Sequence, residues 1–254
     1  MYPSVRIRCQ DIATHLGCDQ LYSVTNADDV PARYSTFICV KAKLNQGEIC
    51  KLAARGRVIW DILDSPPPKI GIAVYLASTQ TIRATFSDYG RIEIIPHHHC
   101  NFENVLNPPD LRRPGWVGTL AWHPRLAGVD HDTYDVRHMK RLDVVNVYKR
   151  IGIGLNVRCE TSEAITHTKF TSGIKLINCL GFGIPSISSR EPAYFEVDPN
   201  CTIFADLADI RYWVDRLQVD DDLYSELRRK CVLESMKYHI ATIAKQYLTL
   251  LISL

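Results

Sequence analysis

Short apolar runs typical of β-strands alternate with segments of helical periodicity along the whole chain, and this alternation restricts the possible folds more than any other feature. Strands separated by helices need crossover connections, which place the strands in parallel sheets. The sequence therefore predicts an α/β fold. Strands are expected over 21–26, 35–41, 57–64, 71–79 (where the alanines leave a helix possible), 91–99, 116–122, 151–157, 184–189 and 201–205. Helices are expected over 4–17, 45–56, 81–90, 142–150, 171–183, 206–217 and 223–251.

The segment 100–115 interrupts this pattern. It contains three prolines and three asparagines and has no periodicity, which is typical of a connection between domains. We therefore expect an N-terminal domain over 1–100, a linker over 101–115 and a C-terminal domain over 116–254. Both are expected to be Rossmann-like and to face each other. Ligands of such sheets bind beyond the carboxyl ends of the strands, so the cleft between the domains is the expected site.

Composition excludes several classes of protein. Apolar residues make up 46% and charged residues 23% of the 254 residues, so the chain is neither disordered nor a coiled coil. The net charge is only +2, which argues against nucleic acid as a partner. The nine cysteines form no C-x-x-C pair and indicate a reducing compartment. No run approaches the ~20 apolar residues of a membrane span, and a cytoplasmic protein is expected.

The segment 168–196 is the most informative for binding. A helix is expected to begin near Ser172, with Lys175 in its first turn. Helix N-termini offer unpaired N–H groups and the positive end of the helix dipole, which suit a diphosphate. Lys175 would add a positive charge at the same place. The alternative is an ordinary crossover helix with a solvated lysine.

Two aspartates end the expected strand 57–64. A carboxylate at the carboxyl end of a strand can face the cleft and accept a proton from an acceptor hydroxyl. Strand alternation places Asp61 and Asp64 on opposite faces, and Asp64, nearer the loop, is the expected catalytic base. Both could instead be solvated or cap a turn. Arg6 and Arg8 could hold an anionic acceptor or lie in solvent.

The run of three histidines before Cys100 invites a metal interpretation. Alternation along an extended segment lets only His97 and His99 share an ion, and the sequence offers no spaced third ligand. We therefore expect no metal. We expect His98 and His99 instead to lie at the hinge beside the cleft, where one could donate to a phosphate or sugar.

Several segments resemble GT-B glycosyltransferases. The run KLINCLGFGIPSI (175–187), followed by Glu191, resembles their donor-binding segment, and WVGTL (116–120) resembles the first strand and glycine turn of the donor domain. FICVK and VIWDILD resemble strands of the acceptor domain of bacterial sugar transferases. The resemblance implies two Rossmann-like domains of GT-B type with a closing C-terminal helix.

The resemblance also implies a function. It is a hexosyltransferase-like reaction that moves a sugar from a nucleotide-sugar donor to a glycan or other hydroxyl acceptor, as in polysaccharide biosynthesis. No metal and no cofactor beyond the nucleotide sugar are implied. The residues expected to bind the donor diphosphate are Gly118, Thr119, Ser172 and Lys175. Asn178 and Glu191 are expected to hold ribose or sugar hydroxyls.

The chain departs from the family pattern at three points. Two glutamates that flank the donor-site helix in many retaining members are replaced by Phe170 and Asn178. The first helix starts almost at Met1, where the family has a strand and a glycine-rich turn, and 254 residues is short for the family. These departures favour an alternative, a non-catalytic nucleotide- or sugar-binding module. A third possibility, a DNA-base glucosyltransferase, would need a basic groove, which the net charge of +2 disfavours.

Overall fold

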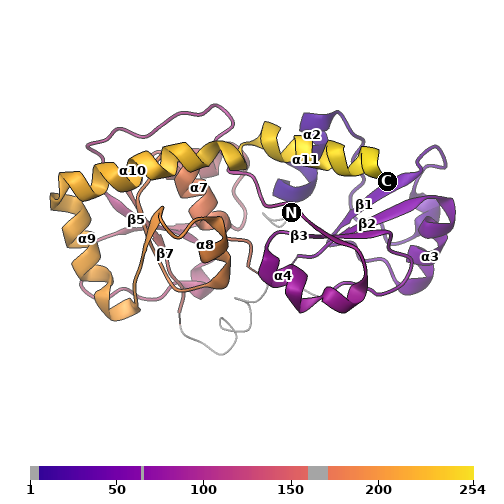
Figure 1. The fold of residues 1–254 in the computed structure, drawn as a ribbon, viewed down its shortest axis with the longest axis horizontal. Helices are drawn as coiled ribbons and strands as arrows, with labels where there is room; N and C mark the ends of the chain where they lie inside the picture. Colours follow the sequence, from indigo (N-terminus) through magenta and orange to yellow (C-terminus); the bar gives the residue numbers. More distant parts are fainter. Residues whose placement is uncertain (1–5, 64–65, 160–170) are drawn as a thin grey trace. The chain divides into compact units, whose positions relative to one another are not determined.

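The computed structural model describes residues 6–63, 66–159 and 171–254 (Figure 1). The chain divides between Pro96 and His97 into two compact units. Each unit contains one parallel β-sheet, of four strands in residues 4–96 and of five strands in the unit that begins at His97. Helices connect the strands. The α/β fold predicted from the sequence is therefore confirmed.

In residues 4–96 the sheet follows the order of the sequence, β1-β2-β3-β4, and all neighbouring strands are parallel. Helices begin where side chains can cap them: Asn45 accepts from the backbone N–H of Glu48, and Thr79 accepts from that of Ile82. The elements are η1 (Arg6–Asp11), α2 (Ile12–Leu16), η2 (Ala27–Asp29), β1 (Thr36–Val40), α3 (Gln46–Arg55), β2 (Arg57–Asp61), β3 (Val74–Ala77), α4 (Gln80–Thr85), η3 (Ser87–Tyr89) and β4 (Ile92–Ile94).

In the unit that begins at His97 the strand order is β6-β5-β7-β8-β9, again entirely parallel. The chain leaves β5 toward β6 on one side and then returns to place β7 on the other side. The elements are β5 (Pro114–Gly118), η4 (Leu120–Trp122), β6 (Asp132–Asp135), α5 (Arg141–Tyr148), β7 (Ile153–Asn156), α7 (Ile174–Phe182), β8 (Ser186–Ser188), α8 (Pro192–Val197), β9 (Thr202–Phe204), η5 (Leu207–Asp209), α9 (Ile210–Val219), α10 (Asp221–Ser235), η6 (Met236–Tyr238) and α11 (Ile240–Ser253).

The two faces of this sheet are buried by different helices, as strand alternation requires. Trp116 of β5 packs in a cluster with residues of β7, α9 and α10, whereas the adjacent Val117 packs in a cluster with residues of α5 and α7. The sheet is thus covered on both faces, which is the rule for purely parallel sheets. Ligands of such sheets bind beyond the carboxyl ends of the strands, an edge that these helices do not cover by packing on the faces.

Several expectations about secondary structure were wrong. The strand expected over 116–122 ends at Gly118 and is followed by η4, and helix α8 was not expected. Residues 21–26 form no strand, because Ser23 has a left-handed φ of +57° and Asn26 caps η2 instead. Strand β6 was missed because its sequence, DTYD, has carboxylates at both ends. Finally, the expected helix 223–251 is divided: His239 is extended, and its Nδ1 accepts from the N–H of Ala241 to start α11.

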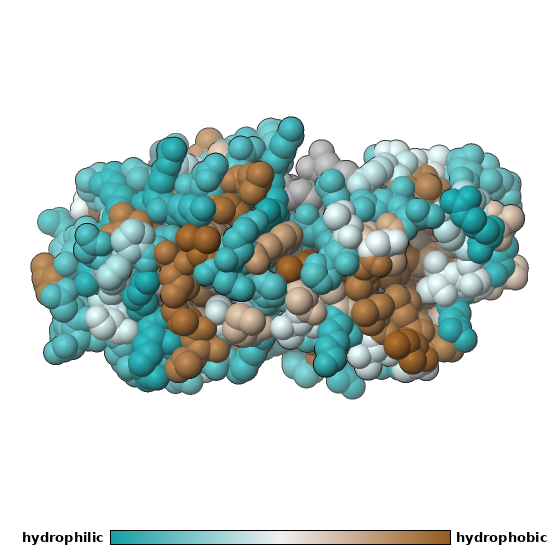
Figure 2. All heavy atoms as spheres, turned by 90° about the horizontal axis from the view of Figure 1, so that it is seen from above, coloured by the Kyte–Doolittle hydropathy of each residue, from teal (hydrophilic) through white to brown (hydrophobic). Residues whose placement is uncertain are grey.

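Hydrophilic residues cover most of the face drawn in Figure 2, and apolar residues gather there in smaller patches. Among the residues that the structure describes, no helix combines the length and the apolar character needed to span a bilayer.

Candidate functional site

The strand order identifies one place where a ligand is expected. In open parallel sheets the site lies outside the carboxyl ends of two strands whose connections run in opposite directions. In the sheet β6-β5-β7-β8-β9 these two strands are β5 and β7. Gly118 ends β5, Arg158 follows β7 by two residues, and Glu191 follows β8 by three. Helix α7 begins near the same edge, because it connects β7 to β8.

Lys175, in the first turn of α7, has an unusual environment. Its Nζ is inaccessible to solvent and makes no hydrogen bond with any residue in the described part of the chain. It lies 4.2 Å from the centre of the Trp116 ring, in a cation–π arrangement. A Cβ atom at Gly118 would lie 2.6 Å from Cη2 of Trp116 and 3.0 Å from this Nζ, so only glycine fits there. Trp116 and Gly118 thus pack tightly around the buried amine of Lys175.

The surroundings of this amine disfavour its positive charge. Burial, with a smaller contribution from the neighbouring Arg158, lowers the pKa of Lys175 to about 7, although Glu191 opposes the shift. A cation buried without an acceptor is costly. An anion placed beside Nζ would remove that cost.

Glu191 is held by several donors. It is 4% exposed, and its Oε1 accepts from Nε of Arg158 at 2.9 Å and from Oγ of Ser189 at 3.0 Å. Its Oε2 accepts from Oγ1 of Thr171 at 3.3 Å. These contacts fix the carboxylate at the carboxyl edge of the sheet, beside the start of α7.

The other residues expected to bind the donor occupy different positions. Thr119 directly follows β5 and is half-buried, and Ser172 is half-buried just before the left-handed Gly173 that precedes α7. Asn178 is buried, and its Oδ1 accepts from the backbone N–H of Cys100 at 2.9 Å. The structure thus gives Asn178 a partner of its own, and it connects residue 100 to α7.

Of the residues expected on the acceptor side, the structure describes the side chains of Asp61 and Arg8 but not those of Arg6 and Asp64. Asp61 is 1% exposed and forms a two-point ion pair with Arg8, with Nε to Oδ2 at 2.7 Å and Nη2 to Oδ1 at 3.1 Å. Arg8 is therefore not in solvent. The backbone of Arg6 belongs to η1, but its side chain is not among those described. Asp64 lies outside the described residues, as does Phe170.

The histidine run is buried. His97, His98 and His99 are 2%, 1% and 0% exposed. Nδ1 of His98 lies 2.9 Å from the carbonyl oxygen of His99. The ring of His99 packs against Gly181 and lies 5.6 Å from that of His239. His99 is thus part of the core, because its ring fills the space that glycine leaves on α7. Among the described residues no three His, Cys, Asp or Glu side chains converge as a metal site would require.

Sequence reasoning missed three side chains near the site. Trp116 was assigned only to a strand, Arg158 had no expected role, and His123 was not singled out. The ring of His123 meets Trp116 edge-on, with centroids 4.9 Å apart and planes at 88°. The one signal in the sequence was the position of Arg158 directly after an apolar strand, which places it at the carboxyl edge.

Two α/β units, each with an entirely parallel sheet, have the GT-B fold. Solved structures agree. Anabaena Alr3699/HepE, in complex with UDP and glucose, is 10% identical and superposes with a TM-score of 0.58 over 88% of this chain and 79% of that chain. A sucrose-phosphate synthase from Thermosynechococcus elongatus is 12% identical, with a TM-score of 0.58 over 87% of this chain and 73% of that chain.

A glycosyltransferase from Rickettsia africae ESF-5 is 10% identical, with a TM-score of 0.57 over 98% of this chain and 81% of that chain. No protein-family model matches the sequence, and no curated protein matches it. At these identities the similarity establishes the fold.

Proposed function

We propose that this chain is a glycosyltransferase that moves a sugar from a nucleotide-sugar donor to a hydroxyl group of a glycan or another acceptor. The observation that carries the proposal is the buried Nζ of Lys175, which has no acceptor among the described residues and lies where a sheet of this strand order binds ligands. A donor diphosphate would supply the missing acceptor. Solved structures of similar fold contain UDP and UDP-glucose, which supports a nucleotide diphosphate.

The proposed reaction uses these groups as follows. The acceptor oxygen bonds to the anomeric carbon of the sugar while the bond to the diphosphate breaks, and the diphosphate leaves with the electron pair. Lys175 and the first N–H groups of α7 stabilise the charge that develops on the diphosphate. Gly118 and Thr119 line the approach, with Ser172 beside the helix start. Glu191 accepts from a ribose or sugar hydroxyl. The acceptor proton passes to Asp64, or to the departing phosphate in a retaining reaction.

Replacement of Lys175 by methionine tests the proposal. Loss of one charged hydrogen bond to a phosphate costs about 1.5–3 kcal/mol, so we expect UDP-glucose affinity to fall about 10- to 100-fold. Titration calorimetry with UDP-glucose measures this, and release of UDP in the presence of acceptor sugars measures turnover. Lys245→Met, at an exposed position of α11, is the control and should bind as the parent does. Equal affinities of the two variants would contradict the proposal.

The pH dependence of the same titration gives a second readout. An anion bound at Lys175 raises the pKa of this lysine above its value of about 7. The contribution of Lys175 to UDP-glucose affinity is therefore greatest below pH 7, where the amine is already protonated before binding. It falls by at most about tenfold per pH unit above pH 7. The diphosphate of UDP-glucose carries no group that titrates near neutrality, so the slope reports on the protein, and Lys175→Met should abolish it.

We propose further that the reaction needs no metal ion, because Lys175 and the start of α7 can stabilise the leaving group. Turnover is then expected to persist in excess EDTA, with the nucleotide released at the same rate. A loss of turnover that added Mg²⁺ or Mn²⁺ restores would overturn this part of the proposal.

A non-catalytic module that binds nucleotides or sugars remains the second candidate. It is favoured by Asn178, which stands where many retaining relatives have a glutamate and whose oxygen is already engaged by Cys100. Binding of UDP-glucose with no release of UDP, with any of a panel of sugar acceptors, would favour this candidate over the enzyme.

A further inference from the structure

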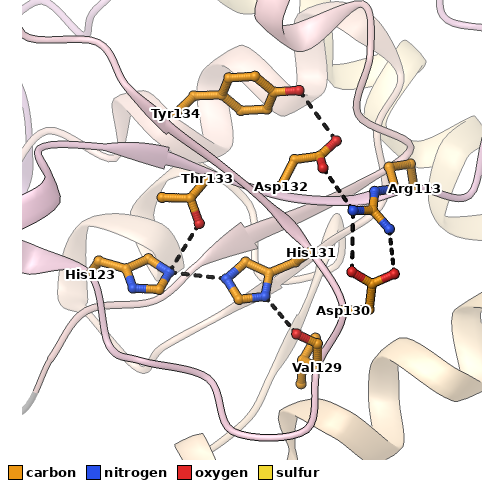
Figure 3. Close-up of polar contacts among 8 residues, drawn as sticks. All are labelled: Arg113, His123, Val129, Asp130, His131, Asp132, Thr133 and Tyr134. Atoms are coloured by element: carbon orange, nitrogen blue, oxygen red, sulfur yellow. Dashed lines mark hydrogen bonds and ion pairs between the residues drawn. The ribbon is translucent and has the colours of Figure 1, made fainter.

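Two histidines hold the segment between β5 and β6, residues 119–131. Figure 3 shows His123 and His131 facing each other, with Nε2 of one 3.0 Å from Nε2 of the other. The ring centroids are 5.3 Å apart and the planes differ by 15°, so the rings meet tip to tip. Oγ1 of Thr133, on β6, lies 3.4 Å from Nε2 of His123. The pair thus connects the end of η4 to the start of β6.

The outer nitrogens fix where the protons lie. The backbone N–H of Arg125 points at Nδ1 of His123 at 3.3 Å, so this nitrogen accepts and His123 carries its proton on Nε2. Nδ1 of His131 lies 2.8 Å from the carbonyl oxygen of Val129, which can only accept, so His131 carries its proton on Nδ1. His123 therefore donates to His131. Every ring nitrogen is satisfied when both rings are neutral.

An added proton has no place in this arrangement. On Nε2 of His131 it would face the N–H of His123, and on Nδ1 of His123 it would face the N–H of Arg125. Either position replaces an attraction by a repulsion between donors. Protonation of the pair must therefore break one of the links that hold the segment 119–131.

Several charged groups surround the histidine pair. Burial first, and then the neighbouring His131 and Lys175 of α7, lower the pKa of His123. Asp130 and Asp132 lie close to His131. Both carboxylates are already paired with Arg113, at 2.7 Å each (Figure 3). Arg211 of α9 adds a positive charge beside the segment. Its Nη1 would lie 3.2 Å from a Cβ atom placed at Gly128.

The pair is joined to the candidate donor site through Trp116. The ring of His123 makes a T-shaped contact with this ring and Lys175 lies over it, while Nε1 of Trp116 donates to the carbonyl of Val157 at 2.8 Å. The turn of η4 joins His123 to Thr119, because the N–H of Trp122 donates to the carbonyl of Thr119 at 2.8 Å. A change in the pair reaches both the tryptophan that supports Lys175 and the residue after β5.

We propose that His123 and His131 are positioning residues, whose neutral pair holds segment 119–131 so that Gly118 and Thr119 face the donor, and that protonation of the pair releases this segment and weakens donor binding. The inference rests on the proposed function for its effect on binding. The restraint of segment 119–131 by the neutral pair does not depend on a ligand, so it can be measured separately.

The first arm of the test is free of any ligand. Deuterium exchange of peptides spanning 119–131, corrected for the intrinsic rate at each pH, is compared at pH 7.5 and pH 5.5. The parent is expected to exchange at least about tenfold faster at pH 5.5. His131→Gln keeps an oxygen that can accept from Nε2 of His123 but does not titrate, so its exchange should depend little on pH. His131→Leu should exchange rapidly at both pH values.

The second arm is the titration with UDP-glucose over the same range. Protonation of Lys175 raises affinity alike in parent and variant over this range. The affinity of the parent, relative to that of His131→Gln, is therefore expected to fall at least about tenfold from pH 7.5 to pH 5.5. His138→Gln, at an exposed position outside the pair, is the control and should follow the parent.

The outcomes separate the two claims. Exchange in 119–131 that does not respond to pH, or responds equally in His131→Gln, overturns the inference whatever the donor does. Exchange that responds as expected, with an acid loss of affinity that His131→Gln retains, overturns the link to binding. Exchange that responds in a protein that binds no UDP-glucose at any pH supports the hold on the segment and overturns the proposed function.

Discussion

Asp61→Asn is expected to destabilise the unit of residues 4–96 by about 3–5 kcal/mol, the usual cost of breaking a buried ion pair by removing one partner. The carboxylate and the Arg8 guanidinium are 0% and 1% exposed and meet in a two-point contact. Nη1 of Arg8 also donates to the carbonyls of Ile95 and Pro96. The asparagine would leave this positive charge buried without its counterion. Urea unfolding measures the loss, and deuterium exchange of the β2 peptide assigns it to this unit.

Asp88→Asn is the matched control. Asp88 pairs with Lys69 at 2.7 Å, and both side chains are more than half exposed. Exposed pairs contribute about 0–1 kcal/mol, so this variant should unfold nearly as the parent does. An Asp61→Asn protein within about 0.5 kcal/mol of the parent would show that Arg8 is solvated, contrary to the structure.

A double variant distinguishes the cost of leaving the Arg8 charge buried without a counterion from the loss of the contact with Asp61. Arg8→Met together with Asp61→Leu removes both charges and keeps apolar volume. We expect it to be more stable than Asp61→Asn alone, because no buried charge remains. Recovery should be partial, because the carbonyls of Ile95 and Pro96 lose a donor.

The fold could be predicted because each central strand is a short apolar run bounded by turn residues. RVIWD and IGLN are nearly fully buried and have the continuous apolar pattern of central parallel strands. Edge strands are less buried, so their sequences need not show this continuous apolar pattern. DTYD of β6 is polar and half-exposed, and its carboxylates are neutralised by Arg113 and Arg137. The pattern of apolar residues along the sequence does not reveal these ion pairs.

The candidate site could be predicted only in part. A helix start with Lys175 in its first turn can be recognised locally, and Glu191 follows a strand. That Trp116 lies under Lys175, or that Arg158 holds Glu191, depends on the order of strands in the sheet. The order β6-β5-β7 is set by packing between segments far apart in the chain. The alternation of polar residues also could not show that Asp61 pairs inward with Arg8 rather than facing an acceptor.

A second large effect is expected from His99 in acid. Burial first, and then the neighbouring His239 and His98, lower the pKa of His99 to about 3, against a weaker opposing effect of the backbone at Ser235. The unfolded chain takes up this proton near pH 6.5 and the folded chain does not. The stability that the neutral ring contributes is therefore complete above pH 6.5. It is lost as pH falls from 6.5 toward 3, by up to about 1.4 kcal/mol per pH unit.

Replacing His99 by leucine removes this titration, so the slope of unfolding free energy against pH should decrease by close to one proton between pH 6.5 and pH 4. The slope is the readout, because it is independent of how much the leucine disturbs packing against Gly181 at neutral pH. Carboxylates titrate alike in both proteins and cancel in the comparison. His138→Gln, at an exposed histidine, should leave the slope unchanged. If His99→Leu keeps the parent slope, His99 is protonated in the folded protein and its ring must reach solvent, in contradiction to its place in the core.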